Sequence, residues 1–202
     1  MSALQHTIYF IRHGETKWNT EGRLQGQTDT PLNDTGQGQA RRNGRVLAEH
    51  LAEQGTLPDT LDYVASPLAR TSNTMEFVRG GLGLAADGYR TDDRLLEINF
   101  GDWEGCSWSE LKAAETAAVD VRRSEPFGWR PPGEGGESYA QASERVADWL
   151  ASVARDCVVV SHGGILRCLR GLVQSLLPGE IPRLETPQDK VVVITASAIR
   201  WV

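Results

Sequence analysis

Cysteine is scarce in this chain of 202 residues. Its three cysteines, Cys106, Cys157 and Cys168, form no CxxC pair and, together with four scattered histidines, show no zinc-ligand spacing. We therefore expect no metal site and no disulfide framework. A small, odd number of cysteines is typical of a reducing compartment, which predicts a cytoplasmic protein.

An excess of positive charge and long apolar runs are also missing. The net charge is −6 at pH 7 and no basic run occurs, which argues against a nucleic-acid-binding surface. No segment approaches the ~18 consecutive apolar residues of a membrane span, and the N-terminus lacks a basic stretch followed by a long apolar run. We therefore expect neither a membrane span nor an export signal. An anionic ligand would have to be attracted by local arginines, against the overall charge.

The composition that remains, 40% hydrophobic and 24% charged, is that of a globular protein, and the length suits one domain over 1–202 with an inserted cap. We expect strands at 8–11, 61–65, 157–160, 191–195 and 199–202, and helices that begin near 35, 66, 108, 138 and 163. This alternation predicts an α/β three-layer sandwich, with helices on both faces of a mostly parallel sheet. The cap or lid is expected at about 103–137, which includes a Pro- and Gly-rich segment at 122–136.

The segment 7–19, TIYFIRHGETKWN, organises the rest of the chain. Its apolar run suits a buried strand, and Gly14 allows the chain to turn sharply directly after Arg12 and His13. These two side chains therefore leave the carboxyl end of a strand, the edge at which open α/β sheets bind ligands. The pattern predicts an anion site that contains an imidazole.

Two later strands end in the same way. Arg70 follows the strand at 61–65, and His162 follows the strand at 157–160 and precedes a Gly163-Gly164 turn that opens a helix. Arginine presents a fork of donors that matches phosphate oxygens, and the N-terminus of a helix also favours an anion. Two histidines allow two separate roles, one as a nucleophile and one as a hydrogen-bond donor to the phosphoryl oxygens. The sequence thus predicts a phosphoryl site.

These residues also carry a resemblance to a known family. Arg12-His13-Gly14-Glu15-Thr16 resembles the RHG signature of the histidine phosphatase superfamily, which includes the cofactor-dependent phosphoglycerate mutases. The similarity continues, in the same order along the chain, through Arg23, Gln25-Gly26, Ser66-Pro67-Leu68-Ala69-Arg70-Thr71, Glu97-Ile98-Asn99-Phe100-Gly101 and Ser161-His162-Gly163-Gly164. It implies a phosphoglycerate mutase-like fold.

The resemblance also implies roles for the site residues. His13 would be the nucleophile that forms a phosphohistidine, while Arg12, Arg70 and His162 would hold the phosphoryl oxygens. Glu97 would donate a proton to the leaving alkoxide and then act as base for the incoming water. The further residues expected to bind substrate are Asn19, Gln25, Gly26 and Gly163. We expect no cofactor and no metal, since the arginines supply the positive charge, and we expect the nearby arginines to lower the pKa of His13.

The resemblance leaves three functions open. The segment that begins at Glu97, EINFGDWEG, resembles the phosphatase branch, including broad-specificity and α-ribazole phosphatases, which favours a histidine acid-type phosphatase acting on a small phosphoester. The alternatives are a phosphoglycerate mutase and a non-catalytic protein that binds a phosphorylated ligand. Arg122-Arg123 faintly resembles the paired arginines with which mutases hold a substrate carboxylate, although a solvated charge pair is the simpler interpretation. The sequence allows a monomer or a homodimer.

Two further interpretations of the aromatic residues between the strands also stay open. Trp103, Trp108, Phe127 and Trp129 either line a substrate pocket beneath the Pro- and Gly-rich segment or form the core of the cap.

Overall fold

The computed structural model describes residues 4–202, so the first three residues of the predicted domain lie outside the described part. Within it, six strands form one sheet in the order β3-β2-β4-β1-β5-β6. Their bounds are β1 Ile8–Arg12, β2 Asp62–Ala65, β3 Arg90–Thr91, β4 Cys157–Ser161, β5 Val191–Ile194 and β6 Ile199–Trp201. The pairs among β1 to β4 are parallel, whereas β5 runs antiparallel to both β1 and β6. The mostly parallel sheet and its antiparallel edge are confirmed.

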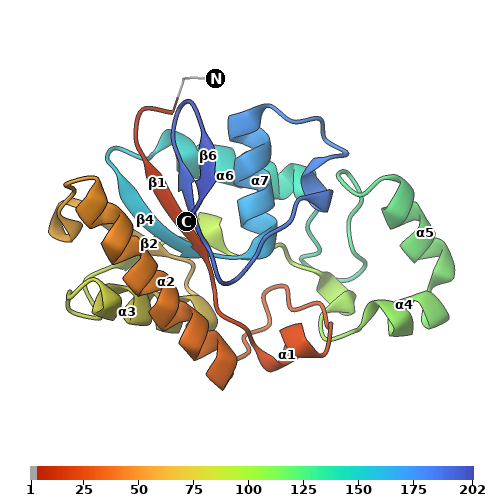
Figure 1. The fold of residues 1–202 in the computed structure, drawn as a ribbon. Coiled ribbons are helices and arrows are strands. Elements are labelled where there is room, and N and C mark those ends of the chain that lie inside the picture. The colour runs from red at the N-terminus through yellow and green to blue at the C-terminus, as the bar shows by residue number, and fades with distance from the viewer. Residues whose placement is uncertain (1–3) are drawn as a thin grey trace.

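Helices cover both faces of this sheet (Figure 1). On one face, α2 (Asp34–Glu53) and α3 (Ala69–Gly81) pack buried leucine, methionine and valine side chains against one set of alternating strand residues. On the other face, α6 (Tyr139–Ala151) and α7 (Gly163–Gln174) cover the second set. Because successive strand residues point to opposite faces, the apolar runs of β1 and β4 supply both cores. The three-layer α/β sandwich is confirmed.

Local signals explain most helix ends. Asn33 accepts a hydrogen bond from the backbone N–H of Gly36 at 2.8 Å and caps α2, and Ser138 forms a capping box with Gln141 at the start of α6. Gly55, with φ of +66°, follows the end of α2 as expected of a C-terminal stop.

Three predicted helix boundaries are wrong. Helix α3 begins at Ala69 rather than at Ser66, because Asp29 accepts the Ala69 N–H at 2.8 Å in place of a local cap. A single helix is expected to begin near 108 and end near 118, before the Pro- and Gly-rich segment at 122–136. The structure has two helices instead, α4 (Trp108–Ala114) and α5 (Thr116–Ser124), so the first residues of that segment are helical. The sequence predicts that Pro178-Gly179 ends the last helix, but α7 already ends at Gln174, because the next residue, Ser175, adopts a left-handed conformation with φ of 53°.

A few short elements complete the chain. A single helical turn, α1 (Lys17–Thr20), follows the first strand, and 3-10 turns occur at Pro58–Thr60, Asp93–Leu95, Gly101–Trp103 and Ile181–Arg183. None of the helices between residues 4 and 202 has the length and apolar character that crossing a membrane requires.

Candidate active site

The two histidines are brought together by neighbouring parallel strands. In the register of β1 with β4, Arg12 lies opposite Ser161, and the backbone N–H of His13 donates to the Ser161 carbonyl at 2.9 Å. The rings of His13 and His162 follow these strand ends, with centroids 5.2 Å apart. Strand β2 lies on the other side of β4, so the segment that leads to Arg70 starts from the same edge. The structure thus brings together the ends of three strands that the sequence separates by up to about 150 residues.

The tautomer of His13 is set by its own neighbour. Its Nδ1 lies 2.8 Å from the Gly14 carbonyl oxygen, which can only accept, so Nδ1 carries the proton and Nε2 of the neutral ring holds a free electron pair. The residue is 3% exposed. Burial lowers the pKa of His13 well below 6.5, and the charges of Arg70 and Arg12 lower it further. The predicted direction is correct, but burial contributes more than the arginines do.

His162 is completely buried and has one free ring nitrogen. Its Nε2 lies 2.8 Å from the Ser66 hydroxyl, whereas Nδ1 has no hydrogen-bond partner in the described part of the chain. Burial, followed by the charge of Arg70, holds the pKa of His162 well below its ordinary value, so the ring is neutral. An unpartnered polar atom in the interior is costly unless a ligand meets it.

Both arginines donate hydrogen bonds to backbone carbonyls. Arg70 is 0% exposed and donates to the carbonyls of Thr28 at 2.8 Å and Gly26 at 2.7 Å, and Arg12 donates to the Thr186 carbonyl at 2.7 Å. The Nε atoms of both are buried without a partner among residues 4–202. Burial lowers the pKa of Arg12 to about 10 and also lowers the pKa of Arg70, while the charge of Glu97 acts in the opposite sense on both. Both guanidinium groups remain charged at neutral pH.

Glu97 lies at the N-terminus of α7, where its two carboxylate oxygens accept the Gly164 N–H at 3.1 and 3.2 Å. The backbone N–H of Gly164 is therefore taken by Glu97, while the preceding Gly163 lines the cleft itself. A Cβ on Gly163 would lie 3.4 Å from Arg12 Nε, so glycine allows the guanidinium a close approach to the helix.

The remaining predicted residues lie around the same cleft. Asn19 Oδ1 accepts hydrogen bonds from the Thr16 N–H and from Gln188 Nε2, both at 3.1 Å. Because these bonds occupy the amide oxygen, the NH₂ group of this cleft residue is left as a donor. Gln25 accepts from the Thr30 hydroxyl at 2.7 Å, and the carbonyl of Gly26 receives Arg70. Both residues position the loop that carries the Arg70 contacts.

A cleft of about 150 Å³ joins these groups. Eight of the nine predicted site residues line it. The ninth, His162, does not line the cleft, but its ring packs edge-to-face against the ring of His13. Sequence reasoning did not assign the other lining residues, which are Arg23, Leu24, Phe100, Tyr139, Gly164, Arg167 and Thr186. Spacing offered a signal for Arg167, which lies four residues after Gly163 on one face of α7. Thr186 and Gln188 lie in a segment without any motif.

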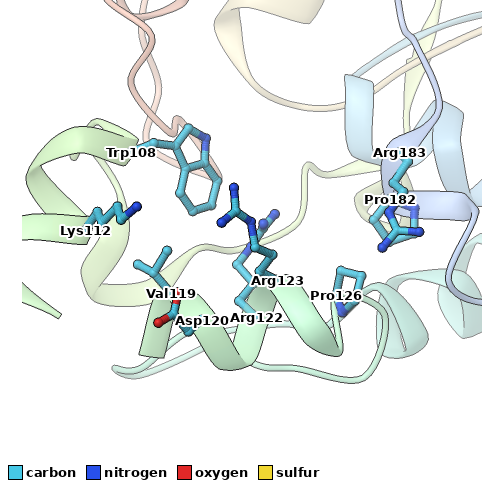
Figure 2. Close-up of a pocket in the computed structure, with 9 residues that line it drawn as sticks. All are labelled: Trp108, Lys112, Val119, Asp120, Arg122, Arg123, Pro126, Pro182 and Arg183. Carbon is cyan, nitrogen blue, oxygen red and sulfur yellow. The ribbon is translucent and has the colours of Figure 1, made fainter. Parts of the chain in front are cut away.

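A second, larger cleft of about 460 Å³ lies between α4, α5 and the turn at Ile181–Arg183. Figure 2 shows Arg122 and Arg123 rising from α5, with Trp108 on one side and Pro182 and Arg183 on the other. The Arg122 guanidinium lies 4.3 Å from the centre of the Trp108 ring, so Arg122 is packed rather than freely solvated.

The aromatic residues of the predicted cap pack mainly on one another. Trp103 is fully buried, with ring centroids 4.5 Å from Trp129 and 6.0 Å from Trp108. Phe127 packs against the core under α6 and α7. None of the four lines the cleft at His13. The buried Trp103 supports the interpretation as core of this segment, whereas Trp108 is 38% exposed and lines the second cleft.

Comparison with known proteins agrees with this geometry. Residues 8–202 match the sequence profile described as "Histidine phosphatase superfamily (branch 1)". The chain belongs to this superfamily.

Relatives within the superfamily include phosphatases and mutases. A glucosyl-3-phosphoglycerate phosphatase of Mycolicibacterium vanbaalenii is 32% identical over 181 residues, which cover 84% of this chain and 74% of that protein. A probable phosphoglycerate mutase, GpmB of Salmonella paratyphi C, is 32% identical over 183 residues, which cover 84% of this chain and 75% of that protein. The solved structure of a mycobacterial glucosyl-3-phosphoglycerate phosphatase aligns with a TM-score of 0.75 at 29% identity, over 98% of this chain and 96% of the other.

In this histidine phosphatase superfamily member, Glu104 organises the loop that holds Arg70. Its carboxylate accepts the backbone N–H groups of Gln27 and Thr28, both at 2.8 Å, and of Phe100 at 3.1 Å. The carbonyls of Gly26 and Thr28 in the same loop bind the Arg70 guanidinium. Glu104 therefore links the start of the predicted cap to an arginine of the cleft.

We expect Glu104→Ala to lower the free energy of unfolding by about 2 kcal/mol, since it leaves these backbone donors without their charged acceptor. It should also weaken the binding of inorganic phosphate, because the Arg70 contacts lose their support. Urea denaturation and calorimetric titration measure the two effects. Glu49→Ala, at an exposed position of α2, is the matched control and should change neither by a comparable amount. Unchanged stability and phosphate affinity in Glu104→Ala would contradict this role.

The two buried histidines predict a loss of stability in acid. Both are neutral in the fold, with pKa values well below 6.5, whereas in the unfolded chain they take up protons as the pH falls through 6.5. Below that pH the unfolded state binds more protons, so each histidine lowers the free energy of unfolding by up to about 1.4 kcal/mol per pH unit. Urea denaturation at pH 7.5, 6.5 and 5.5 should show this decline, and His162→Gln should reduce its slope. Equal stability at pH 6.5 and 5.5 would refute the prediction.

Proposed function

We propose that this protein is a phosphomonoesterase that acts on a small phosphorylated metabolite through a phosphohistidine at His13. One observation carries the proposal: beside the neutral imidazole of His13, in a small cleft lined by Arg12 and Arg70, three buried nitrogens have no hydrogen-bond partner among residues 4–202. These are the Nε atoms of Arg12 and Arg70 and Nδ1 of the adjacent His162. A tetrahedral oxyanion matches such a set of donors. In support, a related mycobacterial phosphatase, 30% identical, has been solved in complex with VO3.

In the first proposed step, the electron pair on His13 Nε2 attacks phosphorus, and the bond from phosphorus to the ester oxygen breaks. Glu97 transfers its proton to the departing alkoxide. Arg12, Arg70 and His162 stabilise the charge on the three remaining phosphoryl oxygens, with the NH₂ group of Asn19 as a further donor. Phosphoryl transfer depends mostly on such positioning and electrostatic stabilisation, and the positive charge here comes from guanidinium groups.

In the second step, water attacks the phosphohistidine. Glu97, now a carboxylate, removes a proton from the water, the bond between phosphorus and nitrogen breaks, and His13 regains its electron pair as inorganic phosphate leaves. The hydrogen bond from Nδ1 to the Gly14 carbonyl holds the ring in one orientation throughout. A positioned acid and base of this kind contributes roughly 10²–10⁴ in rate.

We further propose that residues 103–137 form a cap over the cleft. The segment contains α4, α5 and the packed tryptophans, and its first residues are joined to the 26–28 loop through Glu104. Because the relatives include a phosphatase of glucosyl-3-phosphoglycerate, sugar phosphates and phosphorylated hydroxy acids are the first substrates to test.

A phosphoglycerate mutase is the second candidate. It is favoured by Arg122 and Arg123, which lie together at the second cleft, and by the relatives described as probable mutases. Incubation with 3-phosphoglycerate separates the two functions. Release of inorganic phosphate supports the hydrolase, whereas conversion to 2-phosphoglycerate without net release supports the mutase. Inactivity towards a panel of phosphoesters, with binding intact, would identify a non-catalytic binding protein and refute the proposal.

A further inference from the structure

Ser66 follows β2, in a position where sequence reasoning assigned it to a helix cap that the structure does not form. It is fully buried, and both of its backbone groups are occupied: its N–H donates to the Val160 carbonyl at 3.0 Å, and its carbonyl accepts the Thr71 hydroxyl at 2.7 Å. The position of its Cα is therefore fixed by β4 and by α3. Its hydroxyl points to His162, at 2.8 Å from Nε2.

This contact bears on which nitrogen of His162 carries the proton. A neutral imidazole has one N–H donor and one acceptor nitrogen, and the partner of one nitrogen selects the state of the other. If the Ser66 hydroxyl donates to Nε2, the proton of the ring lies on Nδ1. Nδ1 is the nitrogen that is buried without a partner among residues 4–202, and the His162 ring that carries it lies against the ring of His13.

We propose that Ser66 is a positioning residue that donates its hydroxyl proton to His162 Nε2 and thereby makes Nδ1 a hydrogen-bond donor to a phosphoryl oxygen. This inference rests on the proposed function, because it assigns a ligand to Nδ1. With the opposite tautomer, Nδ1 would present an electron pair to an anion and repel it.

The charged neighbourhood explains why tautomer control is needed. A protonated histidine would donate from both nitrogens and need no partner to select one. Burial and the charges of Arg70, Arg12 and Arg145, together with His13, hold the pKa of His162 low and keep the ring neutral. A neutral ring donates from Nδ1 only in the tautomer in which Nε2 is unprotonated. A hydroxyl group that donates its proton to Nε2 favours this tautomer.

Three variants test the inference. Ser66→Ala removes the hydroxyl, Ser66→Thr keeps it, and Ser143→Ala removes a buried hydroxyl from α6 that lies outside the cleft. We expect Ser66→Ala to lower kcat/KM for an aryl phosphate about 10- to 100-fold, a smaller loss than deletion of an oxyanion donor. Ser66→Thr should recover most of the activity, and Ser143→Ala should match the parent protein.

The readout that a merely structural role would not move is the ¹⁵N NMR spectrum of the His162 ring. The parent protein should show Nδ1 protonated and Nε2 unprotonated, and Ser66→Ala should shift the proton towards Nε2. A parent protein with the proton on Nε2 overturns the inference even if it releases phosphate, and this measurement stands if Ser66→Ala fails to fold. Unchanged kcat/KM in a folded Ser66→Ala variant also overturns it.

The same data separate this inference from the proposed function. If the proton lies on Nδ1 and shifts in Ser66→Ala, but the parent protein hydrolyses no phosphoester, the control of the ring by Ser66 is supported and the proposed function fails.

Discussion

Replacing His13 with alanine is expected to reduce phosphate release by on the order of 10⁴-fold or more, the scale of loss that follows removal of a catalytic nucleophile. No other described group in the cleft combines a free nitrogen electron pair with proximity to Arg12 and Arg70. His13 Nε2 has that electron pair because Nδ1 is committed to the Gly14 carbonyl, and the low pKa of the buried ring keeps it unprotonated in mildly acidic solution. Activity should therefore persist below pH 6.5.

The measurement combines steady-state kinetics with a trap for the intermediate. Quenching under alkaline conditions, which preserve a phosphohistidine, followed by mass spectrometry should place a phosphoryl group on His13 of the parent protein and on no site of His13→Ala. The matched control is His50→Ala, which changes a histidine that packs against Tyr9 and does not line the cleft, and this variant should keep full activity. Normal phosphate release by His13→Ala would refute the mechanism.

Substituting Gly14 with alanine should produce a large loss of stability. A Cβ at this position would overlap the carbonyl oxygen of Gly36 and lie 2.7 Å from its carbonyl carbon, where the end of β1 meets the first turn of α2. Both sides of this contact are backbone, so no rotation of a side chain relieves the clash. The cost should reach the upper end of that measured for overpacked cores, about 3 kcal/mol or more, which corresponds to a fall in Tm of roughly 6–12 °C for a chain of this size.

Gly38→Ala is the matched control, because Gly38 lies in α2 only two residues after Gly36, the residue that Gly14 contacts. It is exposed within α2 and an added Cβ would meet nothing within 4 Å. Alanine there should stabilise the protein by about 0.5–1 kcal/mol through better helix propensity. Thermal and urea denaturation of both variants should thus move in opposite directions. Equal stability of Gly14→Ala and the parent protein would contradict this prediction, because it would show that β1 and α2 can move apart with no loss in the free energy of unfolding.

The order of the main strands and helices followed directly from the sequence, because its periodicities are local. The two-residue strand β3, the single-turn helix α1 and the separate helix α5 were not predicted. Continuous apolar runs indicate that β1, β4 and β5 are buried on both faces, and the spaced leucines of α2 and α7 indicate which face of each helix is buried. The predicted start of α3 was wrong because a distant residue decides it. Helix α3 begins at Ala69 because Asp29 accepts its N–H, and no local pattern around Ser66 reveals a cap that comes from 40 residues away.

The identities of the principal cleft residues were also set by the sequence, since arginine, histidine and glycine at strand ends leave a recognisable pattern. Only the tertiary structure decided how each group is used. His13 and the two arginines are oriented by backbone carbonyls, which are those of Gly14, Gly26, Thr28 and Thr186. The Ser66 hydroxyl, after β2, lies within hydrogen-bond distance of His162, after the neighbouring strand β4. Carbonyls have no sequence signature, and burial, which dominates the pKa of both histidines, depends on every element that packs around them.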